Sequence, residues 1–208
     1  RFNSFGNRIE KSFKRHFIYF IEFYVNAFLQ YQQLIETALK NKSYGFAPKE
    51  LYEPISYFMS LGGKRLRPIL VLSACDLFDG DINKAQHVAL ALETFHNFTL
   101  VHDDIMDKAP LRRNNPTVHQ KWNDNIAILS GDVMLVKAYE ELCMSDVAML
   151  PQLLTIFNKT AIEVCEGQQM DMNFESQSKV SISQYLKMIE LKTAVLLGCS
   201  LKMGAIIA

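Results

Sequence analysis

The sequence predicts an all-α protein built as a helical bundle, on three observations. Apolar residues recur every three or four positions through long runs such as HVALALETFHNFTLVHDDIM and LPQLLTIFNKTAIEVCEGQQMDM. No alternating pattern of comparable length, the signature of half-buried strands, accompanies them. Proline and glycine are scarce, and their clusters in YGFAP, LGGKRLRP, DGD and APLRRNNP mark the expected turns.

The expected helices are apolar over more than one narrow stripe, which is typical of central helices packed on most sides. In order, they cover residues near 13–41, 50–60, 65–78, 82–107, 117–145, 150–174 and 181–208. Basic residues precede the apolar run at 14–29, as in a signal peptide, but Glu22 and Asn26 interrupt it. It is also shorter than the roughly 20 apolar residues of a membrane span. We therefore expect a helix packed against a partner, and one domain over residues 1–208 without a membrane span.

Composition narrows the function classes. Lysine and arginine equal aspartate and glutamate at 22 each, so no global field would attract nucleic acid or an anionic membrane. Any anion binding must be local. The four cysteines, Cys75, Cys143, Cys165 and Cys199, are far apart within apolar helical patterns. They indicate buried reduced thiols rather than disulfides or metal ligands, which favours a cytoplasmic setting.

An acidic stripe ends the expected helix 82–107. At about 100° per residue, His96, Thr99, Asp103 and Asp107 share one face, whereas Asp104 points away from it. Two carboxylates on one face suit a hard cation such as Mg²⁺, which takes its other ligands from water and phosphate. Solvated acids are the alternative, but a helix C-terminus disfavours acids.

Two basic clusters accompany this stripe. Pro110 should end the helix and place Arg112 and Arg113 on a loop, where two guanidiniums suit a diphosphate. In the upstream segment GGKRLRP, a glycine pair is followed by three cations, Lys64, Arg65 and Arg67. The segment lacks the spacing of a nucleotide P-loop. A solvated basic loop would explain either cluster alone. Together with the acidic stripe and the titratable His96, they indicate a phosphate-rich substrate held partly through metal.

The segments GGKRLRP, ETFHNFTLVHDDIMDKAPLRR, GQQMD and LKTAVLL occur in the order found in trans-isoprenyl diphosphate synthases, the polyprenyl synthetase family. The resemblance covers roughly residues 30–208. Class I terpene cyclases share DDxxD on an all-α fold but lack the GGKRxRP element, because they bind no second, homoallylic diphosphate. The resemblance implies an isoprenoid synthase bundle around a central apolar cavity.

The resemblance also implies a role for each matching residue. Asp103 and Asp107 would ligate Mg²⁺, for which Mn²⁺ could substitute, with Asp104 supporting them. The substrates would be isopentenyl diphosphate, bound by Lys64, Arg65, His96 and Arg113, and an allylic diphosphate, bound by Arg112, Lys192 and Thr193. Gln168 and Asp171 would lie beside the metal cluster without ligating it. On sequence alone, a polar patch is the less favoured alternative for Gln168 and Asp171, whereas a solvated lysine is a stronger alternative for Lys192.

The implied reaction ionises the allylic diphosphate, joins its cation to isopentenyl diphosphate and loses a proton, in a homodimer. A non-catalytic subunit of a heteromer and a terpene cyclase are the competing classes, but the first motif is intact here. The sequence departs from the family in one respect: the second aspartate-rich motif is not found. The aspartates that follow Asp107 are isolated, namely Asp124, Asp132, Asp146 and Asp171. We therefore expect a sequence truncated within an apolar helix at GAIIA, with weak or no turnover by this segment alone.

Product length should depend on Phe98 and Thr99, about one turn before Asp103. The growing apolar chain would need a tunnel between the helices. Thr99 shares the metal face, whereas Phe98 either forms part of the wall of this tunnel or fills the protein core. The aromatic residue five positions before the first aspartate resembles short-chain synthases that make geranylgeranyl or farnesyl diphosphate. We predict a short product, which Phe98→Ala should lengthen in a chromatographic assay; unchanged length would show that Phe98 is not the tunnel floor.

Overall fold

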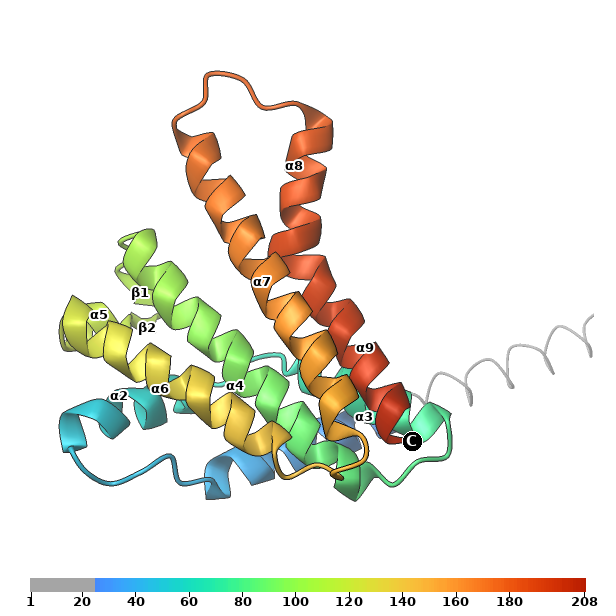
Figure 1. The fold of residues 1–208 in the computed structure, drawn as a ribbon. Helices are drawn as coiled ribbons and strands as arrows, with labels where there is room; N and C mark the ends of the chain where they lie inside the picture. The colour runs from blue at the N-terminus through green and yellow to red at the C-terminus, as the bar shows by residue number, and fades with distance from the viewer. Residues whose placement is uncertain (1–24) are drawn as a thin grey trace, which may run out of the picture.

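The computed structural model describes residues 25–208, which form a bundle of helices (Figure 1). The all-α prediction is confirmed, and residues 25–41 are helical as expected. The rest of the predicted helix 13–41, with most of the run at 14–29, lies outside the described residues. The helices that follow are α2 (Lys49–Ser60), α3 (Leu66–Leu77), α4 (Ile82–Met106), α5 (Val118–Lys121), α6 (Asp124–Leu142), α7 (Leu150–Glu175), α8 (Ile182–Ile189) and α9 (Val195–Ile207).

Helix α4 is the central element. Every residue from Val88 to Phe95 is buried, so this stretch has neighbours on all sides. Helices α3, α6 and α9 all pack against α4, and α7 adds an aromatic contact in which the rings of Phe95 and Phe157 meet edge to face at 5.0 Å. The C-terminal half of α7 and helix α8 extend together beyond the other helices (Figure 1). The core therefore holds α4 rigidly along the length that leads to its C-terminal end.

Two predicted helices are interrupted. The expected helix 117–145 divides into α5 and α6, because the Asn123 side chain accepts a hydrogen bond from the backbone of Ile126 and starts a new helix there. The expected helix 181–208 contains a π-helical turn, η1 (Glu190–Ala194), between α8 and α9. The prediction of one helix over 117–145 was wrong because the apolar periodicity runs on through the break. Residues 182–207 are helical without a gap, as predicted, apart from the π-helical turn.

A small hairpin follows α4. Strands β1 (Leu111–Arg112) and β2 (Asn115–Pro116) pair antiparallel, which the sequence did not predict. The two turn residues, Arg113 and Asn114, have φ angles of 53° and 62°, as the tight turn of a two-residue hairpin requires. A turn was expected in APLRRNNP, but without the usual glycine its hairpin form could not be recognised.

The cysteine prediction was half right. All four thiols are free, and Cys75 and Cys199 are buried, but Cys143 and Cys165 are exposed. Cys143 follows the last residue of α6, where the chain leaves the core. Within residues 25–208, no helix combines the length and apolar character that crossing a membrane requires.

Two glycines of α9 give a matched test of its packing. A Cβ on Gly204 would overlap the backbone oxygen of Val71 in α3, whereas a Cβ on Gly198 would meet nothing within 4 Å. Gly204→Ala should lower the free energy of unfolding by about 1–3 kcal/mol. Gly198→Ala should raise it by up to about 1 kcal/mol, because alanine favours the helix. Chemical denaturation measures both, and equal effects would contradict this packing.

Candidate active site

An apolar pocket of about 180 Å³ lies between α4, α7 and the η1–α9 segment. Its polar lining includes six predicted site residues on these elements: His96, Thr99, Asp103, Gln168, Lys192 and Thr193. Its apolar lining comes chiefly from Phe98, Leu100, Met106, Val164 and Leu196. The pocket thus joins an apolar interior to a group of charged residues.

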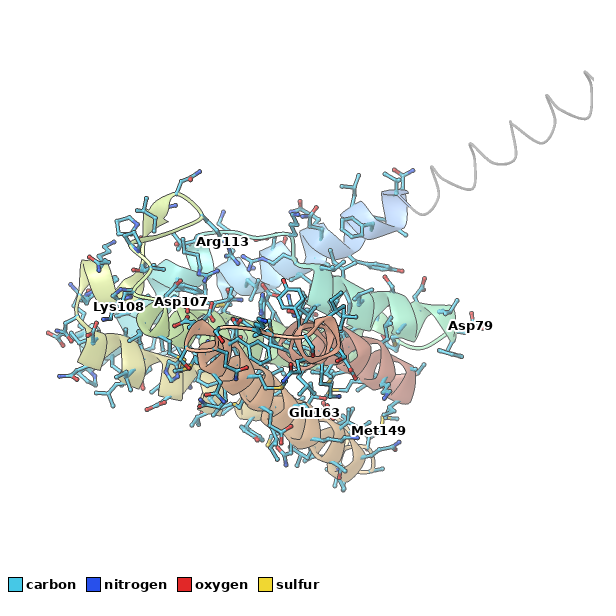
Figure 2. All side chains as sticks on the ribbon, turned by 90° about the horizontal axis from the view of Figure 1, so that it is seen from above. Asp79, Asp107, Lys108, Arg113, Met149 and Glu163 are labelled. Atoms are coloured by element: carbon cyan, nitrogen blue, oxygen red, sulfur yellow. The ribbon has the colours of Figure 1, made fainter. Side chains whose placement is uncertain are left out.

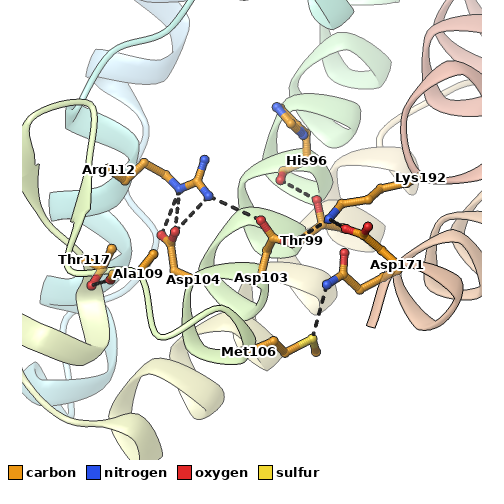
Figure 3. Close-up of polar contacts among 11 residues, drawn as sticks. His96, Thr99, Asp103, Asp104, Met106, Ala109, Arg112, Thr117, Asp171 and Lys192 are labelled. Carbon is orange, nitrogen blue, oxygen red and sulfur yellow. Dashed lines mark hydrogen bonds and ion pairs between the residues drawn. The ribbon is translucent and has the colours of Figure 1, made fainter. Parts of the chain in front are cut away.

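The close approach of two helices brings Lys192 into this site. A Cβ on Gly167 of α7 would overlap the backbone nitrogen of Lys192, so only glycine allows α7 and η1 to pack at this distance. The π-helical turn carries Lys192 toward α4, where its Nζ lies 2.6 Å from Asp171 Oδ2 and 3.2 Å from Asp103 Oδ1 (Figure 3). Burial alone would lower the pKa of Lys192, but these two carboxylates raise it above its ordinary value.

Asp103 has one carboxylate oxygen that is ion-paired but accepts no hydrogen bond. Its Oδ1 atom is buried and accepts no hydrogen bond of good geometry, although Lys192 lies within ion-pair distance. One turn later, Asp107 is exposed beyond the last residue of α4. Burial, followed by the charge of Asp103, raises the pKa of Asp107. The acidic stripe therefore carries negative charge that nearby cations only partly neutralise.

Asp104 lies away from the stripe, as its position on the helix predicted. Its side chain is 1% exposed, and Arg112 Nε donates to both of its carboxylate oxygens at 2.8 and 2.9 Å (Figure 3). The same guanidinium reaches Asp103 Oδ2 at 3.4 Å. Asp104 thus holds Arg112 beside Asp103, which is consistent with the supporting role expected of it.

The hairpin connects the two basic clusters. Arg113 donates a hydrogen bond to the backbone oxygen of Gly62, and its guanidinium packs against Gly63. Both glycines have positive φ angles, 76° and 154°, in the segment that leads to the exposed Lys64. Asp107 and Arg113 lie toward one end of the bundle, whereas Asp79 lies at the other (Figure 2). Both clusters are therefore at the C-terminal end of α4.

The two arginines of GGKRLRP lie on different sides of the chain. Arg65 is buried against Glu36 and Glu93, away from the pocket lining, which differs from the expected substrate contact. Arg67 instead lines the pocket and contacts His96 Nε2 at 3.0 Å through Nη1. Arg67 was expected only as a member of this basic cluster, and the resemblance assigned Arg65 to isopentenyl diphosphate instead. The two arginines flank one residue, and nothing in the pattern says which of them faces the pocket.

His96 is neutral in this setting. Burial lowers its pKa to about 3, and the positive charges of Arg67 and Arg113 act in the same direction. Because arginine can only donate, Nε2 accepts the hydrogen bond from Arg67 and the ring proton resides on Nδ1. The expectation of a titratable His96 is therefore wrong for the neutral pH range.

The remaining predicted residues line or border the pocket. Thr193 and Gln168 line it, and the Gln168 amide lies 3.8 Å from the sulfur of Met106. Phe98 contacts the rings of Phe95 and His102, with centroids 5.7 and 4.8 Å away. Phe98 is therefore part of the pocket wall.

The donor set fits a hard divalent cation. Among residues 25–208, no group of three or more His, Cys, Asp and Glu side chains is arranged to hold a metal alone. Asp103 and Asp107 nevertheless supply carboxylates on one face, and Asp103 Oδ1 is buried without a hydrogen bond. Mg²⁺ is commonly held by one or two carboxylates together with water and substrate phosphates. The site therefore suits Mg²⁺ bound jointly with a diphosphate.

Comparison with known proteins agrees with this arrangement. Residues 48–208 match polyprenyl synthetase, so the chain belongs to that family. A geranylgeranyl diphosphate synthase of Methanosarcina mazei is 42% identical over 162 residues, 77% of this chain and 50% of the relative. A crystal structure of geranylgeranyl pyrophosphate synthase matches with a TM-score of 0.84 and 48% identity, over 86% of this chain and 55% of the other. The crystal structure of geranylgeranyl pyrophosphate synthetase from Pyrococcus horikoshii matches with a TM-score of 0.83 and 38% identity, over 88% of this chain and 58% of the other.

The chain spans about half the length of the curated relatives it matches. Residues 48–208, which match the family, contain the GGKRLRP, DDIMD, GQQMD and LKT segments. The family resemblance inferred from these motifs is confirmed.

The pKa of His96 gives a direct test. An unfolded chain protonates histidine near pH 6.5, whereas the folded protein resists protonation down to about pH 3. The stabilisation by neutral His96 is therefore complete above about pH 6.5 and is lost as the pH falls toward 3. In a histidine NMR titration, the His96 ring signals should stay constant between about pH 5 and 8. A midpoint near 6.5 would contradict a neutral ring held beside Arg67.

Proposed function

We propose that the protein is a Mg²⁺-dependent prenyltransferase that condenses isopentenyl diphosphate with an allylic diphosphate. The product would be a short trans-prenyl diphosphate, either farnesyl or geranylgeranyl diphosphate. The observation that carries this proposal is the set of charged contacts at the edge of an apolar pocket, above all Asp103 between Lys192 and Arg112. A substrate with an apolar chain and a diphosphate head matches both parts of the site.

The allylic diphosphate would bind beside the acidic stripe. Asp103 and Asp107 would hold Mg²⁺, which when bound supplies positive charge to the leaving pyrophosphate. Arg112 and Lys192 already lie against Asp103 and would bind the diphosphate oxygens, with Thr193 nearby. As the carbon–oxygen bond breaks, these side chains would offset the negative charge that develops on pyrophosphate. The hydrogen bonds that Arg112 donates to both oxygens of Asp104 fix Arg112 for this task.

Isopentenyl diphosphate would bind at the second basic cluster. Lys64 and Arg113 are joined through the Gly62–Gly63 turn, and Arg67 contacts neutral His96 at the pocket. These groups would anchor the second diphosphate, so that the double bond faces the allylic cation. A new carbon–carbon bond then forms, and the proton lost from isopentenyl diphosphate passes to the departing pyrophosphate. No side-chain base is required.

The pocket supports a short product. Its volume of about 180 Å³ is below the roughly 300–1,000 Å³ of typical ligand pockets. Phe98 forms part of its wall, so its ring limits the space available to an apolar chain. We propose that Phe98, with Thr99 on the metal face, sets the chain length.

We also propose a cytoplasmic homodimer. Ile128, Leu129 and Val136 of α6 are exposed apolar side chains, which supports an interface with a second copy. The free thiols support a reducing compartment.

The test uses the protein expressed from its complete gene. Isopentenyl diphosphate is incubated with dimethylallyl, geranyl or farnesyl diphosphate, in Mg²⁺ or EDTA, and products are resolved by chain length. We expect metal-dependent elongation that stops at a farnesyl or geranylgeranyl product. Asp103→Asn should reduce turnover by about 100-fold or more, whereas the distant Asp79→Asn should leave it unchanged.

Other outcomes would contradict specific parts of this proposal. Elongation to long chains would contradict the limit set by Phe98. A hydrocarbon product formed without consumption of isopentenyl diphosphate would identify a terpene cyclase. A folded protein that elongates no primer would be a non-catalytic subunit.

A further inference from the structure

Arg65 occupies an unusual position for a residue in a substrate-binding motif. It immediately precedes α3, its φ angle of 50° is left-handed, and its side chain is only 1% exposed. Its neighbour Lys64 is exposed, and Arg67 lines the pocket. The chain therefore turns Arg65 into the protein while its neighbours face outward or toward the site.

The guanidinium of Arg65 is already occupied on three sides. Its Nε donates to Glu36 Oε1 at 2.7 Å, and its Nη1 donates to Glu93 Oε1 at 2.6 Å. Its Nη2 donates to the backbone oxygen of Met59 at 3.2 Å. Burial would lower the pKa of Arg65, but the two carboxylates outweigh it and raise the pKa. This network joins helix 25–41, the end of α2, the start of α3 and α4.

Binding a diphosphate directly would require Arg65 to leave Glu93. The Glu93 side chain is 3% exposed, and the amide of Asn97 donates to the same oxygen at 3.1 Å. An amide cannot neutralise a carboxylate, so Glu93 would be left as a buried unpaired charge. Breaking a buried ion pair in this way is strongly unfavourable. The geometry therefore disfavours Arg65 as a substrate contact.

The contact with Met59 gives Arg65 a different task. Met59 lies near the end of α2, so the bond from Arg65 to its carbonyl closes the segment 60–64 into a compact loop. Arg113 holds the same loop from the hairpin side through the backbone oxygen of Gly62. Lys64 projects from this loop, between the two attachments. Its position therefore depends on how firmly the loop is held.

Glu93 connects the loop to the pocket. It precedes His96 by three residues on the rigid, buried part of α4, and His96 contacts Arg67. Arg65 therefore ties the loop that bears Lys64 to the helix that bears His96 and Asp103. Resting on the proposed function, we propose that Arg65 is a positioning residue that orients Lys64 toward isopentenyl diphosphate without touching the substrate.

The test compares Arg65→Gln, Glu93→Gln, the double variant and Lys64→Ala in the protein from the complete gene. Two quantities are measured: the KM for isopentenyl diphosphate, and hydrogen exchange of the backbone in residues 60–65. Arginine and glutamine both carry a Cβ, so the left-handed backbone at position 65 costs a similar free energy with either residue. Backbone strain is therefore matched between the unmodified protein and these variants. Lys64→Ala is the matched control, because it removes a proposed ligand from the same loop without touching the buried network.

We expect Arg65→Gln to raise KM by about 10-fold and to speed loop exchange, because Glu93 loses its partner. Adding Glu93→Gln removes the stranded charge but restores none of the bonds that Arg65 makes to Met59 and α4, so loop exchange should stay fast and KM should stay raised. Lys64→Ala should raise KM by about 10-fold or more with loop exchange unchanged. This combination would distinguish positioning from direct binding.

Two results would overturn the proposal. One is a double variant with normal loop exchange whose KM remains as high as that of Lys64→Ala, since Arg65 would then contact the substrate itself. The other is normal loop exchange in Arg65→Gln alone. If Lys64→Ala leaves KM unchanged, or no variant elongates substrate, the proposed function fails at this loop, and the exchange measurement still decides the role of Arg65.

Discussion

The ion pairs of Lys192 with Asp103 and Asp171 are the contacts on which the candidate site depends. They join α4, α7 and the π-helical turn, which contribute three sides of the pocket. They form only because Gly167 lets the turn approach α7 closely. A larger residue there would separate the helices and remove Lys192 from the acidic stripe.

Two cations of the site are held by carboxylates before any ligand arrives. Asp104 holds Arg112, and Asp103 with Asp171 holds Lys192. Such preorganisation is the physical basis of electrostatic catalysis, because the charged side chains need little reorganisation when negative charge develops on a leaving group. A metal bound by Asp103 and Asp107 would neutralise the carboxylates that now restrain the cations. Metal and diphosphate should therefore favour each other's binding.

The sequence could predict the features that follow from helical periodicity. The shared face of His96, Thr99 and Asp103 was such a feature, as was the separate direction of Asp104. The resemblance to the family added Lys192 and Thr193, which periodicity alone would have read as an ordinary helix surface. The broad apolar pattern of residues 82–107 also predicted the central position of α4.

Features decided by local backbone geometry could not be predicted. The left-handed conformation of Arg65 directs it inward, whereas Arg67 faces the pocket, and the letters of the motif do not distinguish them. A turn was expected in APLRRNNP, but the left-handed conformation of Arg113 and Asn114 and the two short strands beside them were not. The π-helical turn at Lys192 depends on Gly167, a residue of another helix, and so on tertiary packing.

The most direct measurement is the binding of inorganic pyrophosphate by calorimetry, with Mg²⁺ or with EDTA. We predict that Mg²⁺ strengthens binding at least about fivefold, because it offsets the charge of Asp103 and so makes Lys192 available to the diphosphate. Asp103→Asn should abolish this dependence on metal. Equal affinity for pyrophosphate with and without Mg²⁺ in the unmodified protein would contradict a joint metal and diphosphate site.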